Sequence, residues 1–72
     1  MKLSYYSETD SLYIDLSERV SVESREISAG IVLDYDEDGN LVGIDIDNAS
    51  EKVQLGEVIV RGLAGKQGRR SG

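Results

Sequence analysis

Residues 31–46, IVLDYDEDGNLVGIDI, contain the pattern that decides the fold. Apolar side chains stand at every second position on both sides of a polar centre, which is the period of a strand with one buried face. Asp38-Gly39 favours a turn at the centre, because glycine adopts positive φ without a Cβ clash. We predict an antiparallel hairpin that pairs residues 31, 33 and 35 with 46, 44 and 42 around the loop 37–40. Its inner face would carry Ile31, Leu33, Tyr35, Val42, Ile44 and Ile46.

The N-terminal segment repeats this period around a second polar turn, residues 7–10. Pairing Leu3 with Ile14 and Tyr5 with Leu12 places the apolar side chains of both segments on one face. A second antiparallel hairpin is therefore predicted here.

The segment between the two hairpins is less regular. Val20 and Val22 are predicted to begin a strand, and a bulge over residues 23–25 would absorb the break in parity before Ile27. The expected fold class is mainly β with minor α, an antiparallel β-meander of four to five short strands.

The pattern changes after residue 47. Asn48 and Glu51 have the spacing of a capping box, so we predict a short helical turn near 49–55 that ends before Gly56. Residues 57–61 indicate an extra strand, and a longer helix over 49–63 is the alternative. Residues 62–72 are rich in glycine and basic, which predicts a disordered tail behind a single domain of residues 1–61.

Composition excludes several classes of site. The 72 residues include no cysteine and no histidine, which rules out thiolate metal sites and the usual Ser-His pair. We expect no enzymatic activity and no cofactor. There is no apolar run of about 20 residues, so no membrane span is expected, and cytoplasmic localisation is the prediction.

Charge is unevenly distributed along the chain. Residues 1–60 hold all 14 acidic residues and four of the eight basic ones, a net charge of −10. The other four basic residues lie in 61–72. The acidic body favours basic partners and disfavours nucleic acid, and the tail residues Lys66, Arg69 and Arg70 would bind nucleic acid only weakly.

Two segments carry a family resemblance. YYSETDSLYIDLSE (residues 5–18) and GIVLDYDEDGNLVGIDIDNAS (residues 30–50) resemble the domain-of-unknown-function family 2283, small prokaryotic proteins. The resemblance implies a small β-meander with a short C-terminal element and no established catalytic residues. It also implies a link to antitoxin-like partners. Asp45 stands where the family more often has glutamate.

The turn DYDEDG, residues 34–39, has the opening of a calcium-binding loop. Asp34, Asp36 and Asp38 are the candidate calcium ligands. An EF-hand needs flanking helices, however, and these residues are flanked by predicted strands. An acidic hairpin turn is the favoured interpretation.

The outer sheet face is the other candidate site. Its carboxylates, Asp15, Asp34, Asp45 and Asp47, lie on a flat surface with no cleft, which argues against a hydrolase. Tyrosine is enriched at protein interfaces, so Tyr6 and Tyr13 on this face are interaction candidates. The full set of interaction candidates is Tyr6, Tyr13, Asp34, Asp36, Glu37 and Asp38.

The leading hypothesis is a non-catalytic protein-interaction module, an antitoxin-like partner of a basic protein. A calcium- or ligand-binding domain and a structural homo-oligomer are the alternatives. Because apolar groups occur on both faces of a small sheet, a homodimer or another protein partner is expected.

Overall fold

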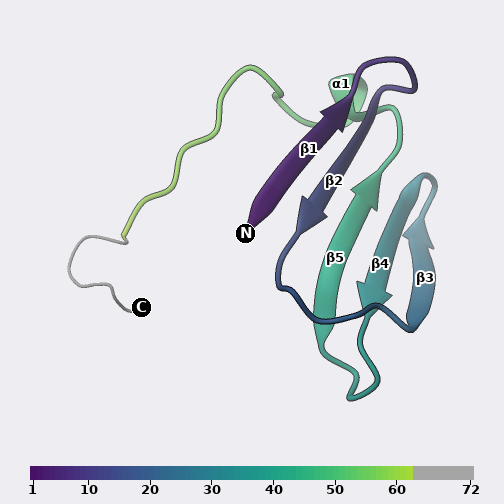
Figure 1. The fold of residues 1–72 in the computed structure, drawn as a ribbon. Coiled ribbons are helices and arrows are strands. Elements are labelled where there is room, and N and C mark those ends of the chain that lie inside the picture. The colour runs from purple at the N-terminus through teal and green to yellow at the C-terminus, as the bar shows by residue number, and fades with distance from the viewer. Residues whose placement is uncertain (63–72) are drawn as a thin grey trace.

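The computed structural model describes residues 1–62 and shows one antiparallel sheet of five strands with one short helix (Figure 1). The elements are β1 (Lys2–Tyr6), β2 (Ser11–Asp15), β3 (Glu23–Ser28), β4 (Ile31–Tyr35), β5 (Leu41–Ile46) and α1 (Ala49–Lys52). The predicted class, mainly β with minor α, is confirmed. The tail predicted over 62–72 lies, from residue 63 on, outside the described residues.

The strand order is β1-β2-β5-β4-β3, so the expected sequential meander is wrong in one connection. After β2 the chain crosses the end of the sheet to the far edge, and β5 inserts beside β2 (Figure 1). The apolar residues explain this strand order, because Leu12 and Ile14 of β2 are paired with Ile46 and Ile44 of β5. The polar strand β3 is exposed along its whole length, as suits an edge strand.

Both predicted hairpins form. Leu3 pairs with Ile14 and Tyr5 with Leu12 in the first, and Ile31 pairs with Ile46 and Leu33 with Ile44 in the second. The last predicted pair is wrong by one residue, since a register shift after Asp34 places Tyr35 opposite Leu41 rather than Val42.

The bulge in β3 also lies further along the chain than predicted. The register shifts between Glu26 and Ser28, not over residues 23–25, and the strand begins at Glu23 rather than at Val20. Nevertheless, the amide of Val22 donates to the carbonyl of Tyr35 at 2.8 Å, which extends the ladder by one bond. The extra residue falls where the chain turns from β3 into β4, because the β3–β4 turn has to reverse the chain through Ala29 and Gly30 (φ 76°).

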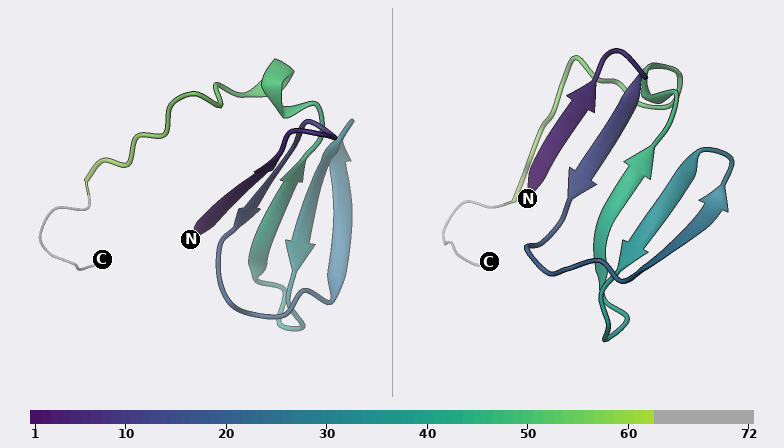
Figure 2. Two further views of the ribbon diagram at one scale, coloured as in Figure 1. Left: turned by 45° about the horizontal axis from the view of Figure 1, so that its top comes forward. Right: turned by 45° about the vertical axis from the view of Figure 1, so that its right-hand side comes forward.

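The core lies on one face of the sheet only. Leu12, Ile46 and Ala49 are buried, and the side chains of Ile14, Ile44 and Leu55 pack against them. The other predicted inner residues, Ile31, Leu33 and Tyr35, are half-buried, and Val42 is buried. The sheet is a single layer with α1 at one end, so much of this face has no second layer over it (Figure 2).

The helix is shorter than the predicted 49–55, and its start differs from a capping box. Asn48 adopts a left-handed conformation (φ 52°) and makes no side-chain cap hydrogen bond. Instead, the carbonyl of Asp10 accepts a hydrogen bond from the amide of Ala49 at 2.8 Å. A residue of the β1–β2 turn thus replaces the local cap.

Residues 57–61 form neither the predicted strand of the sheet nor the alternative helix over 49–63. They continue as an extended segment that leads away from the sheet (Figures 1 and 2). Gly56 and the three β-branched residues 58–60 disfavour continuation of α1. Within residues 1–62 there is no helix with the length and hydrophobicity needed to cross a bilayer.

Candidate interaction surface

The face opposite the core carries the polar residues of the three central strands. The sheet register places Tyr13 of β2 beside Asp45 of β5, and Asp45 beside Val32 of β4. One pair further along, Gly43 lies between Asp15 and Asp34. Asp15, Asp34 and Asp45 therefore share one surface with Tyr13, as the alternation predicts, and we call this surface the polar face.

Tyr13 and Gly43 fit together at the centre of the polar face. The phenol ring of Tyr13 occupies the space that a side chain at Gly43 would need, since a Cβ there would lie 2.7 Å from the ring atom Cζ. Glycine in a strand weakens it unless something covers the backbone. Here the Tyr13 ring supplies that cover, which explains a glycine at the middle of the central strand.

The Tyr13 hydroxyl is held by Asp34. It donates to Oδ2 of Asp34 at 2.9 Å, and the hydroxyl of Ser24 donates to Oδ1 at 2.6 Å. Both carboxylate oxygens of Asp34 are thus engaged, and the two bonds join β2, β3 and β4 across the sheet.

Negative charges are crowded together on the polar face, as the pKa values of its residues indicate. Burial, together with Asp34 and the nearby charges of Asp15 and Asp45, raises the pKa of Tyr13 to about 12. Burial and the charges of Asp47 and Asp34 raise the pKa of Asp45 above its usual range. Both shifts reflect negative groups crowded on a partly desolvated surface.

Few cations neutralise this charge within residues 1–62. Lys2 is the register partner of Asp15, but no ion pair forms between them. The ammonium group of Lys52 donates to the backbone carbonyls of Ala29 and Asp47 at 3.1 and 2.6 Å, not to a carboxylate. The two ion pairs within residues 1–62 lie away from the polar face and join Arg19 to Asp36 and Arg25 to Glu23.

The acidic turn after β4 is organised by Asp36. This side chain is only 7% exposed, and it accepts hydrogen bonds from the amides of Asp38 and Asn40 at 2.9 and 2.8 Å. The Asn40 side chain and Arg19 donate to its other oxygen at 3.1 and 3.3 Å. These donors, the Asn40 amide first, lower the pKa of Asp36. The carboxylate therefore closes the loop from within.

This geometry separates the calcium candidates. Asp34 is bound to Tyr13 and Ser24, Asp36 is bound within its own loop, and Asp38 is exposed. In the part of the chain that the structure describes, no three His, Cys, Asp or Glu side chains converge as metal ligands.

The sequence of this sheet matches the model of a known protein family. A family described as "Protein of unknown function (DUF2283)" matches residues 2–50. The chain belongs to this family. The DUF2283 match includes all five strands, the polar face and α1 as far as Ser50, whereas residues 53–62 lie beyond it. No curated protein and no solved structure matches the chain.

Within this DUF2283 fold the predicted interaction residues do not form one patch. Tyr13 and Asp34 are in contact. Tyr6 is exposed near the far end of the edge strand β1, opposite Ser11, and Glu37 and Asp38 are exposed in the β4–β5 loop. The structure therefore narrows the candidate surface to Tyr13 and the carboxylates around it.

Sequence reasoning missed three residues that hold this DUF2283 domain in shape. They are Gly43 beneath the Tyr13 ring, Ser24 bound to Asp34, and Asp10 of the turn 7–10, whose carbonyl accepts the amide of Ala49. Glycine at an inner position of an otherwise regular strand is the one signal that could have indicated a covering aromatic side chain.

Proposed function

We propose that this DUF2283 protein is a non-catalytic protein-interaction module whose polar face binds a basic segment of another protein. The observation that carries the proposal is that the carboxylates around Tyr13, which are Asp15, Asp34 and Asp45, and the neighbouring Asp47 lack an ion pair within residues 1–62. Lysine or arginine side chains of a partner would relieve the mutual repulsion of these groups.

The spacing of the surface suits an extended or helical basic segment. The carboxylates of Asp15, Asp45 and Asp34 come from the neighbouring strands β2, β5 and β4, which lie about 4.8 Å apart, and Asp47 follows two residues after Asp45. Tyr13 adds a flat, partly buried ring at the centre, and rings of this kind are frequent anchors at interfaces. Charge would contribute mainly to the association rate and to partner choice.

The chemistry of the same residues supports binding rather than catalysis. A pKa of about 12 keeps the Tyr13 hydroxyl protonated at neutral pH, so it serves as a hydrogen-bond donor and not as a base or nucleophile. Both oxygens of Asp34 are already engaged by Tyr13 and Ser24. In an antitoxin-like role, the polar face would cover the basic surface of the protein it neutralises.

The test uses a short peptide of alternating lysine and threonine as the probe, with amide chemical shifts as the readout. We expect the largest shift changes on β2 and β5, and an affinity about fivefold lower in Asp15→Asn/Asp45→Asn. Glu8→Gln/Glu51→Gln removes the same charge from exposed positions in the β1–β2 turn and on α1, off the polar face, and should bind as the unaltered protein does. Equal weakening by both variants would show general charge attraction and refute the proposal.

A natural partner can be sought with the same variants. Co-expression with the product of the adjacent gene should give a complex that survives purification, and Asp15→Asn/Asp45→Asn should lose it. A complex that this variant retains in full would place the partner on another surface.

A further inference from the structure

The extended segment Glu57-Val58-Ile59-Val60-Arg61, here called the arm, leaves its apolar side chains in solvent. Val58, Ile59 and Val60 are 66%, 57% and 58% exposed. Within residues 1–62 no backbone hydrogen bond involves residues 57–61. Three consecutive β-branched residues have high strand propensity and low water affinity, so the arm has the composition of a strand without a neighbour.

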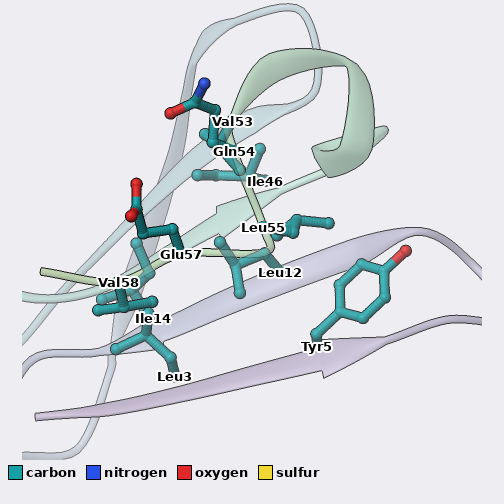
Figure 3. Close-up of a pocket in the computed structure, with 10 residues that line it drawn as sticks. All are labelled: Leu3, Tyr5, Leu12, Ile14, Ile46, Val53, Gln54, Leu55, Glu57 and Val58. Atoms are coloured by element: carbon teal, nitrogen blue, oxygen red, sulfur yellow. The ribbon is translucent and has the colours of Figure 1, made fainter.

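The arm begins at the rim of an apolar groove. The groove has a volume of about 350 Å³ and lies between the core face of the sheet and residues 53–58 (Figure 3). Leu3, Leu12 and Ile14 form its floor, and Val53 and Val58 lie along its opposite wall. Leu3 and Val53 remain exposed, which leaves an apolar surface continuous from the sheet to the arm.

The sequence of the arm is complementary to itself. When two arms run antiparallel about a two-fold axis at Ile59, Glu57 of one copy faces Arg61 of the other, and Val58 faces Val60. Opposite charges and β-branched residues directly across from each other are the favourable cross-strand pairs. We propose that two copies of this chain form a dimer by antiparallel pairing of their arms.

A second copy fits this surface better than an unrelated protein does. The pairing is reciprocal, so each copy supplies what the other lacks, and the two-fold axis closes the assembly at two chains. It satisfies backbone groups of both arms. Val58 and Val60 share one side of the paired strands, and Val58 lines the groove, so this side of the pair meets the groove of each copy at Val58. The polar face is on the other side of the sheet and takes no part.

Sedimentation equilibrium with charge reversal tests the proposed pairing. The unaltered protein should be a dimer at micromolar concentration. Glu57→Arg and Arg61→Glu should each raise the dimer dissociation constant about tenfold, because each introduces two like-charge pairs. The double variant Glu57→Arg/Arg61→Glu should restore the original value. A monomer throughout the concentration range, or no recovery in the double variant, would refute the proposal.

Crosslinking gives an independent readout, since the chain has no cysteine of its own. Ile59→Cys places the two thiols opposite each other at the axis, within the distance that a disulfide spans. It should form a disulfide-linked dimer at least tenfold faster than Val20→Cys, whose position is 77% exposed on the β2–β3 connection. Equal rates would mean random collision and would overturn the arm pairing. The arm lies outside the sheet, so these variants leave the fold and the polar face intact.

Discussion

Asp10 and Ser50, forty residues apart in the sequence, are joined by two hydrogen bonds. The amide of Ser50 donates to one carboxylate oxygen of Asp10 at 3.0 Å, and its hydroxyl donates to the other at 2.7 Å. Tyr5 also donates to this carboxylate, at 2.8 Å. Asp10 itself has positive φ (53°), a conformation that aspartate tolerates better than most residues. It fastens the first hairpin to the start of α1, where the side chain of Asn48 provides no cap.

Asp10 should make the protein sensitive to acid. The hydrogen bonds from Ser50 and Tyr5 lower the pKa of Asp10 from its ordinary value of 3.8. The stability that it contributes is therefore fully present above about pH 4 and is lost as the pH falls through the lowered pKa. Asp10→Asn should be less stable than the unaltered protein at pH 7, and the difference should shrink towards pH 2. Melting temperatures from circular dichroism check this; a difference that grows in acid would contradict it.

The fit of Tyr13 over Gly43 predicts a position-specific cost. Gly43→Ala brings a methyl group into the phenol ring and should destabilise the fold by about 2 kcal/mol. Gly56→Ala is the matched control, because nothing lies within 4 Å of the added methyl, and it should be nearly neutral. Urea denaturation measures both values.

A double-mutant cycle identifies the ring as the cause. In a Tyr13→Ala background the Gly43→Ala change should cost much less, because the space above residue 43 is then open. Equal costs in the two backgrounds would show that the added methyl group clashes with something other than Tyr13.

Tyr13 also predicts sensitivity to alkali. Its pKa is raised from 10.0 to about 12, so the protonated hydroxyl stabilises the fold below pH 10, and this contribution is lost as the pH rises towards 12. Absorbance at the tyrosinate wavelength should show a step near pH 12 that is missing in Tyr13→Phe, measured in a Tyr5→Phe background because the hydrogen bond to Asp10 also raises the pKa of Tyr5. Tyr6→Phe, which alters an exposed tyrosine, should retain that late step. If the late step persisted in Tyr13→Phe, the raised pKa could not belong to Tyr13.

Calcium should leave the stability of this protein unchanged. Both oxygens of Asp36 already accept hydrogen bonds from its own loop and Arg19, and Asp34 is held by Tyr13 and Ser24. We expect the same melting temperature in millimolar calcium and in chelator. An increase with calcium that is lost in Asp38→Asn, which changes only an exposed carboxylate, would show that the turn binds the metal after all.

Much of the fold could be predicted because strand periodicity is a local property. The alternation in 31–46 and in residues 3–14 indicated which side chains share a face, and the Asp38-Gly39 turn fixed the start of the second register. The pattern failed at Tyr35, where the loop hydrogen bonds of Asp36 require one more residue in β5 than simple alternation allows. The polar face was predicted as a set of carboxylates, but not the bond between Tyr13 and Asp34.

By itself, the sequence determined the two hairpins, their apolar and acidic faces, and the family, since each depends on residues close together in the chain. Only the tertiary structure decided the order of the strands. Insertion of β5 between β2 and β4 brings Gly43 under Tyr13. It also brings Ser50, which follows β5 in the chain, into hydrogen-bonding distance of Asp10. Contacts between residues thirty or forty positions apart leave no period in the sequence, because they arise from the packing of whole strands.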